Sequence, residues 1–430
     1  MERYAEVLNY VIPFFMSLLV IERIAAWLKG KKVIHSMDTL SSLGSGLTNA
    51  IKDVLGLTFV IVSYEWMVEH LALFHIEATW LVYVLAFLGL DFAGYWNHRL
   101  AHQVNYFWNH HIIHHSSEEF NLACALRQSI SNFFTIFAFL MIPTALMGIP
   151  AEAVAVLAPL HLFAQYWYHT RLIGKMGFLE KIIVTPSHHR VHHAINDIYL
   201  DKNLSQVFII WDKLFGTFQE ELDEVPPVYG VKRPGRTWNP VIINFYHLWQ
   251  LMKDAWHTDS LAAKLKIWFM PTGWRPPDVQ EKYPLESIED VYAYEKYNPK
   301  SSKWLHIWSW SQFLATFTLM MYLFNNFAAI GFPGVLIYGL FLIFCIFSYS
   351  TLMDRSIHAW WVELIKAITG LFLIFYQGGW FLLDSVVPYG TVMVMAYFVI
   401  ALVISCAFVW FEIRSGKVGV RMKVSQINEI

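Results

Sequence analysis

Residues 83–102 read YVLAFLGLDFAGYWNHRLAH, an apolar run that ends in two histidines four positions apart. A helix that crosses a membrane needs about 20 mostly apolar residues. Residues three or four apart share one face of a helix. This stretch therefore predicts a helix that leaves a membrane and presents two imidazoles from one face just beyond it.

The composition of the whole chain agrees with a membrane protein. Of its 430 residues, 56% are hydrophobic and only 15% are charged, whereas soluble proteins carry about a quarter charged residues. The net charge of −2 provides no basic field for nucleic acid. We therefore expect an integral membrane protein without a nucleic-acid partner.

Nine apolar stretches are long enough to span a membrane, which predicts an all-α integral membrane protein with about nine transmembrane helices. The expected spans are residues 8–27, 54–74, 79–97, 130–148, 150–168, 304–324, 332–350, 360–378 and 388–411. A stretch rich in Pro and charged residues interrupts them. We therefore expect three parts: a histidine-bearing membrane domain over residues 1–219, a cytosolic connecting layer over 220–303, and a four-helix membrane region over 304–430.

Basic residues that flank the first and last spans predict the orientation. They are Lys29, Lys31, Lys32 and Lys52 after the first span, and Arg414, Lys417, Arg421 and Lys423 after the last. Cytoplasmic loops are enriched in Lys and Arg, and nine spans place both segments on that side. This predicts an N-terminus outside, a C-terminus inside and histidines in the cytosol.

Three groups of histidines have the spacing of metal ligands on helices. They are His98 and His102; His111, His114 and His115; and His189, His192 and His193. Imidazole binds Fe, Zn, Cu and Ni. Eight imidazoles exceed the ligands of one ion, so we predict a dinuclear site. His169, at the end of the fifth expected span, is a candidate ninth ligand.

Polar residues near these groups are candidates for holding the imidazoles in place, because a ligating histidine usually donates its second N–H to a carboxylate or carbonyl. The candidates are Asn97, Asn105, Glu118, Asn121, Asp197, Asp201 and Asn203. Arg127 and Gln128, at the start of the fourth expected span, are candidate contacts of a lipid headgroup or reductant. Ordinary solvated or membrane-edge positions remain the alternative for all of these residues.

The histidine motifs resemble those of the fatty acid hydroxylase superfamily, which includes sterol desaturases. The similar strings are HRLAH at 98–102, HHSSE at 114–118, ALRQS at 125–129, TPSHHRVHH at 185–193, DKN at 201–203 and WDKLFGTF at 211–218. Within the superfamily, the flanking strings are most similar to the alkylglycerol monooxygenases, its ether-lipid branch. The resemblance covers roughly residues 35–220 and extends more loosely to the C-terminal spans.

This resemblance implies that the eight grouped histidines bind two iron ions, with O2 as oxidant and a membrane lipid as substrate. Purified protein could hold zinc instead, because zinc also binds imidazoles. In the ether-lipid branch the resemblance implies tetrahydrobiopterin as reductant. That branch usually carries Glu directly after the second histidine of the first motif, and this chain carries Gln103. We therefore predict weak or absent use of tetrahydrobiopterin, with electrons from a separate redox protein.

The expected reaction is hydroxylation of a lipid C–H bond, either beside an ether oxygen or on an acyl chain. A desaturase is the alternative within the same superfamily. A metal transporter or metal-stabilised scaffold is the alternative from another class. Transporters place ionisable residues near the middle of their spans, whereas these histidines gather at the ends of spans. The sequence therefore favours an oxidoreductase.

Overall fold

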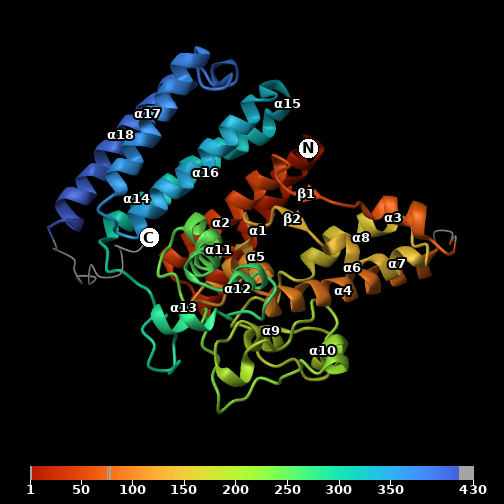
Figure 1. Cartoon of the computed structure of the whole chain (residues 1–430). Coiled ribbons are helices and arrows are strands. Elements are labelled where there is room, and N and C mark those ends of the chain that lie inside the picture. The colour runs from red at the N-terminus through yellow and green to blue at the C-terminus, as the bar shows by residue number, and fades with distance from the viewer. Residues whose placement is uncertain (1, 75, 77–78, 416–430) are drawn as a thin grey trace.

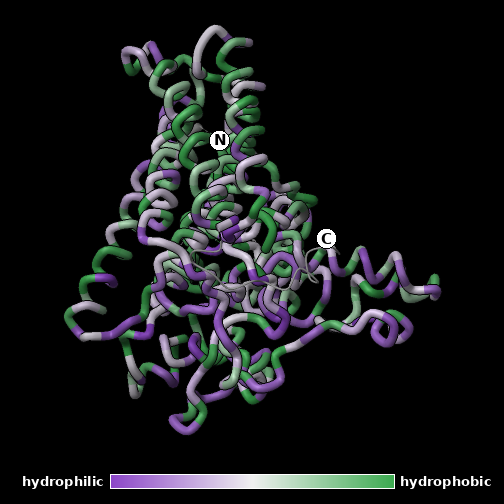
Figure 2. Tube along the Cα trace, turned by 90° about the vertical axis from the view of Figure 1, so that its left-hand side faces the viewer, coloured by the Kyte–Doolittle hydropathy of each residue, from purple (hydrophilic) through white to green (hydrophobic). Residues whose placement is uncertain are grey.

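The computed structural model describes residues 2–74, 76 and 79–415, and this part of the chain is almost wholly helical (Figure 1). Long helices form the upper part of the molecule, and short helices with long loops form the lower part. Figure 2 shows hydrophobic residues concentrated along the long helices and hydrophilic residues in the lower part. The helical architecture and the apolar long helices confirm the prediction of an all-α membrane protein.

The long helices of both chain ends share one hydrophobic core. They are α1 (Glu2–Leu28), α2 (Ser36–Val54), α14 (Lys303–Asn325), α16 (Gly334–Met353), α17 (Ala359–Gln377) and α18 (Gly390–Phe408), with the short α15 (Phe327–Ile330) between α14 and α16. Two glycines permit close helix contact. A Cβ on Gly44 of α2 would lie 2.9 Å from the Tyr349 hydroxyl of α16, and one on Gly370 of α17 would lie 2.3 Å from the Phe398 ring of α18.

A second set of helices extends to one side of this bundle (Figure 1). It comprises α3 (Tyr64–Leu71), α4 (Trp80–Gln103), α6 (Phe137–Leu140), α7 (Ile142–Leu146) and α8 (Ala151–Phe163). Strands β1 (Phe59–Val60) and β2 (Phe134–Thr135) form a short parallel pair at its base. The apolar faces of α4 and α8 pack together, with Val82 and Ala86 of α4 buried against Ala153 of α8.

The remaining α-helices connect long loops, and all of them but the 18-residue α11 are short. They are α5 (Asn105–His115), α9 (Pro186–His192), α10 (Ile210–Phe215), α11 (Pro240–His257), α12 (Leu261–Lys266) and α13 (Pro277–Lys282). Asn239 caps the start of α11, and its side chain accepts hydrogen bonds from the N–H groups of Val241 and Ile242. Helix α10 ends at Gly216, whose φ of 74° closes the helix in a conformation that favours glycine.

Four helical segments are long and apolar enough to cross a membrane: Ala5–Leu28, Gly334–Met353, Ala359–Gln377 and Gly390–Ile413. They coincide with the first and the last three expected spans. The expected spans at 79–97 and 304–324 fall in α4 and α14, which contain 24 and 23 residues but carry more polar side chains.

Three expected spans are wrong as single crossing helices. Residues 54–74 contain a turn at Gly56, β1 and the eight-residue α3, and eight helical residues extend only about 12 Å. Residues 130–148 are divided between β2, α6 and α7. Residues 150–168 contain α8, whose 13 residues reach about 20 Å, less than the ~30 Å hydrocarbon core. Turns and short strands divide the first two segments, and the helix in the third is too short to cross, so apolar composition alone did not predict their continuity.

The expected division into residues 1–219, 220–303 and 304–430 stays a prediction, although α1 and α2 pack against α14 and α16 in one core. Lys417, Arg421 and Lys423, used to predict the orientation, lie outside the described residues.

Candidate metal centre

A break between α4 and α5 brings the first two histidine groups together. Helix α4 ends at Gln103, and Val104 is extended, with φ −121° and ψ 125°. Helix α5 therefore starts in a new direction and packs against α4. The ring centroids of His98 and His111 are 4.6 Å apart, and those of His102 and His115 are 4.8 Å apart.

The third histidine group is placed by the start of α9. Thr185 and His188 form a reciprocal capping box, and Pro186 occupies the first turn. The helix then presents His189 and His192 at one end, with His193 directly after it. His188, although it lies inside the motif, is used for capping.

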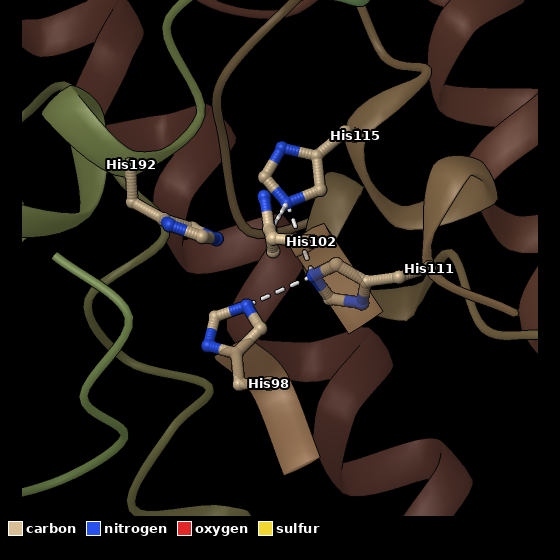
Figure 3. A group of neighbouring side chains, drawn as sticks. All are labelled: His98, His102, His111, His115 and His192. Carbon is tan, nitrogen blue, oxygen red and sulfur yellow. Dashed lines mark hydrogen bonds between the residues drawn. The ribbon is translucent and has the colours of Figure 1, made fainter. Parts of the chain in front are cut away.

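The imidazoles form two adjacent groups. A five-histidine group contains His98, His102, His111, His115 and His192, and a four-histidine group contains His114, His169, His189 and His193. Figure 3 shows the rings of the five-histidine group pointing toward one another from α4, α5 and α9. The groups touch, since the rings of His115 and His193 stack with centroids 4.4 Å apart. All eight predicted histidines and the candidate His169 therefore lie in one place.

Oxygen acceptors fix five of these rings through their Nδ1 atoms. The partners are the carbonyls of Leu204 for His98 (2.7 Å), Lys202 for His192 (3.0 Å), Arg127 for His114 (3.3 Å) and Tyr166 for His169 (3.3 Å), and the Asp201 carboxylate for His102 (3.0 Å). Carbonyls and carboxylates only accept hydrogen bonds. These five imidazoles therefore carry their proton on Nδ1 and direct a bare Nε2 lone pair inward.

In the five-histidine group, no choice of tautomers for neutral rings gives every close pair of inward Nε2 atoms one donor and one acceptor. Nε2 of His98 lies 2.9 Å from Nε2 of His111, which lies 3.0 Å from Nε2 of His115. Nε2 of His115 lies 3.2 Å from Nε2 of His102. If His111 and His115 both donate to these lone pairs, their own N–H groups face each other. A shared cation resolves this conflict.

The four-histidine group contains the same conflict in a simpler form. The bare Nε2 atoms of His114 and His169 lie 3.3 Å apart, so two lone pairs face each other. Nε2 of His189 lies 2.8 Å from that of His169 and 3.0 Å from that of His193. In the other group, the buried Nε2 of His192 has no hydrogen-bond partner in the described part of the chain. Both groups therefore fit a metal ion.

Distances and protonation agree with this fit. Two nitrogens bound at about 2.1 Å and at a right angle on one ion are about 3.0 Å apart, close to the observed separations. Burial lowers the pKa of His98 and of His114 to about 3. Burial also lowers the pKa of His111, His189 and His193 well below the usual value. The rings are thus neutral near pH 7, the form that binds metal.

Two fully buried carboxylates hold the loop that supports the five-histidine group. Asp91 of α4 accepts hydrogen bonds from the N–H groups of Val207 (2.9 Å) and Phe208 (3.0 Å), and from the rings of His161 and Trp211. Asp212 accepts from the N–H groups of Leu204 (2.7 Å) and Ser205 (2.8 Å). Neither Asp91 nor Asp212 was predicted from the sequence to support the site. Asp91 had a visible signal, as the one acidic residue in an apolar helix seven positions before His98.

Of the polar residues predicted to support the imidazoles, Asp201 alone contacts a ring through its side chain in the described part of the chain. The others serve the loops around the site. The amide groups of three asparagines donate to backbone carbonyls: Asn203 to His188 and Gln219, Asn121 to Val33, and Asn105 to Ile267 and Trp274. Glu118 accepts hydrogen bonds from the Tyr294 hydroxyl and the Tyr297 N–H, and Asp197 accepts one from Lys232. Asn97 is half-buried and bonds to no imidazole in the described part of the chain.

The residues predicted to contact a headgroup or reductant have other partners. Arg127 is buried in an ion pair with Asp38 (2.7 Å) and reaches the site through its backbone carbonyl. The Gln128 side chain donates to Ala125 O. Gln103 is exposed at the end of α4, where its side chain accepts a hydrogen bond from Arg99. The position of Gln103 therefore gives no support to a role in excluding a pterin.

A cavity of about 290 Å³ borders the five-histidine group through His102, His115 and His192. Among the described residues, none of the four-histidine group lines it. Its remaining wall mixes aromatic side chains, such as Trp108 and Trp274, with charged side chains from the loops of the lower part. The five-histidine group is thus the one that a small molecule can reach.

Comparison with known proteins agrees with this site. The family model for fatty acid hydroxylases matches residues 83–217, which include all nine clustered histidines. This match, together with the clustered imidazoles, places the chain among the oxygenases of the fatty acid hydroxylase class. Ornithine lipid hydroxylase OlsE of Rhizobium tropici is 30% identical over 135 residues, covering 31% of this chain and 41% of its own length. No solved structure matches the chain significantly.

The match to alkylglycerol monooxygenases extends over most of the chain. The human protein is 36% identical over 381 residues, covering 87% of this chain and 84% of its own length. That of Xenopus tropicalis is 32% identical over 368 residues, covering 85% and 81%. The chain belongs to the alkylglycerol monooxygenase family. The protein is therefore an oxidoreductase, a lipid-hydroxylating monooxygenase, and the predicted family resemblance is confirmed.

Proposed function

We propose that the protein is a di-iron monooxygenase that hydroxylates the chain carbon beside the ether oxygen of a membrane glycerolipid. The observation that carries the proposal is the convergence of nine imidazoles in two adjacent groups with mutually facing Nε2 lone pairs. The family relatives, named for alkylglycerols, suggest the ether lipid. One oxygen atom of O2 enters the C–H bond, and two electrons and two protons convert the other to water. The resulting hemiacetal separates into an aldehyde and a glycerol lipid.

The two iron ions would supply the chemistry of O2 and of the C–H bond. The chain's own residues hold the imidazoles neutral and aim their Nε2 atoms inward through carbonyl acceptors and Asp201. Asp91 and Asp212 keep the supporting loop in place. Zinc fits the same donors, so we expect purified protein to contain zinc unless iron is supplied.

The reaction needs an electron donor, either a reduced pterin or a redox protein. That tetrahydrobiopterin supports little turnover stays a prediction, although the exposed position of Gln103 removes the reason first given for it. The test supplies tetrahydrobiopterin as the sole reductant to iron-loaded protein. Robust product formation would contradict the prediction and would strengthen the assignment to ether-lipid cleavage.

We also propose that the metal centre lies on the cytosolic side of a multi-pass protein. The basic end of α1 lies beside the site, since Lys29 Nζ donates to Leu172 O at 3.0 Å and Glu22 accepts a hydrogen bond from Thr170. Lysines after a span favour the cytoplasm. This supports an N-terminus outside, and reporter fusions at both ends test the predicted orientation.

The decisive experiment compares membranes with and without the protein, supplied with an alkyl glycerolipid carrying an isotope label in its chain. The expected product is a labelled aldehyde. Hydroxylation of an acyl chain would give a stable lipid one oxygen heavier. Desaturation would give a lipid lacking two hydrogens, and a transporter or scaffold would give no product. Any of these three results contradicts ether cleavage.

A further inference from the structure

The wall of the cavity beside the five-histidine group carries more cationic than anionic side chains. Three cationic side chains line it, Lys232, Arg233 and Arg275, together with two carboxylates, Asp201 and Asp254. Aromatic and aliphatic side chains form the remainder of the wall, including Trp108, Tyr246 and Leu251. A cavity of this kind suits a molecule with both a polar and an apolar part.

All but one of the charged side chains in the wall have a close partner. Arg275 forms two hydrogen bonds with Asp254, at 2.7 and 2.9 Å. Lys232 forms an ion pair with Asp197 at 2.6 Å. Asp201 accepts the His102 hydrogen bond at 3.0 Å. The local charges are therefore paired without Arg233.

Arg233 is half-buried in the cavity wall, and its guanidinium has no ion pair or hydrogen bond within the described part of the chain. Asp254, the carboxylate near it, is already occupied by Arg275 and by Gln250 at 2.8 Å. The like charge of Arg275 is also nearby. A guanidinium without a partner in a partly desolvated wall is a binding group for a carboxylate or phosphate.

We propose that this cavity binds the headgroup of the lipid substrate, and that Arg233 holds an anionic oxygen of that headgroup. The inference rests on the proposed function and adds the substrate class, a lipid with a phosphate or carboxylate near its glycerol. Because the same cavity borders His102, His115 and His192, a headgroup there brings the first carbon of the chain to the metal ligands.

The test measures lipid binding to the full-length protein in detergent micelles, by competition against a fluorescent alkyl lipid. The three competitors are 1-O-hexadecylglycerol, its 3-phosphate and its 3-hemisuccinate. We expect the two anionic lipids to bind at least about tenfold more tightly than the neutral one, the scale of a hydrogen bond to a charged group. Arg233→Gln should remove this preference, and Arg233→Lys should retain part of it because the charge remains.

Arg236→Gln is the matched control, since Arg236 is exposed, lies three residues away and faces Tyr294 outside this cavity. It should keep the full preference. Inorganic phosphate alone should not displace the fluorescent lipid. This result would show that the anion must be part of a lipid to bind in the cavity.

Equal binding of all three lipids by the unaltered protein overturns the headgroup proposal. So does an Arg233→Gln protein that keeps the preference, or one that changes only the concentration of reductant needed for turnover. Absence of any oxygenated product with an intact binding preference overturns the proposed function and leaves the headgroup site standing. The two failures are thus distinguishable.

Discussion

The two histidine groups have similar donors but different surroundings. The five-histidine group borders a cavity, and one of its supports, Asp201, has a side chain that is 57% exposed. The four-histidine group is enclosed by aromatic rings: Tyr168 packs on His189 with centroids 4.3 Å apart, and Phe120 packs on His193 at 5.2 Å.

If each group holds an ion, as proposed, we expect this difference to give the two ions different roles. Catalytic metal sites keep a position open to substrate, whereas closed sites serve structure. An ion in the five-histidine group can meet a lipid that occupies the cavity. An ion in the four-histidine group is shielded by Phe120, on which Tyr229 stacks at 5.0 Å. A second ion held there would therefore act through its neighbour.

The largest expected effect is removal of one ligand from either group. His192→Ala and His193→Ala should each lower turnover by at least about 100-fold, beyond the usual effect of a residue that only supports a ligand. Each variant should also lose about one ion per chain, measured by elemental analysis, while membrane insertion is retained. His358→Ala, far from both groups in sequence and contacts, is the control. Normal turnover of either ligand variant would refute the ligand assignment.

Metal removal should separate the two groups. We expect a water-soluble chelator to remove one ion about tenfold faster than the other, because the cavity admits it to the five-histidine group alone. The time course of metal retained per chain measures this. The fast phase should be missing in His192→Ala, and the slow phase in His193→Ala. A single phase for the unaltered protein would remove the distinction between an open and a closed group.

A smaller effect is expected at the support of the open group. Asp201→Asn weakens the acceptor of the His102 N–H, and changes of this kind cost about 10–100-fold in metal affinity or activity. The readout is the metal affinity in competition with a chelator. Asp197→Asn is the control, because Asp197 lies in the same loop and pairs with Lys232 instead of a histidine. Equal losses in both variants would mean that the loop, and not the hydrogen bond, is responsible.

The smallest effect is expected at Gln103. Gln103, in place of the usual Glu, was the basis for predicting weak use of tetrahydrobiopterin, and the Gln103→Glu variant tests that link. Since Gln103 is exposed and outside the cavity, we now expect a change within about twofold, the usual range for surface substitutions. Pterin-supported rates of the two proteins decide this. A several-fold increase would mean that the reductant approaches over the outer face of α4.

Several features of the fold and site were predictable because they are local in sequence. Apolar runs identified the first and the last three spans, since length and hydropathy suffice for a helix in lipid. They failed at 54–74 and 130–148, where Gly56 and a pair of short strands interrupt the chain. The hydropathy of a segment indicates whether it favours lipid or water, but it does not show whether the segment forms one unbroken helix.

The sequence by itself identified eight imidazoles as candidate ligands of two ions, because their spacing along helices is that of metal ligands. Only the tertiary structure decided their division into groups of five and four, the inclusion of His169, and the separation of His114 from His111 and His115. It also decided that the carbonyls of Leu204, Lys202 and Arg127 hold the rings. Every residue has a carbonyl, so sequence cannot single these out. The role of Leu204 and Lys202 depends on where buried Asp91 and Asp212 direct a loop more than 85 residues beyond α5, and that path is set by packing between distant segments.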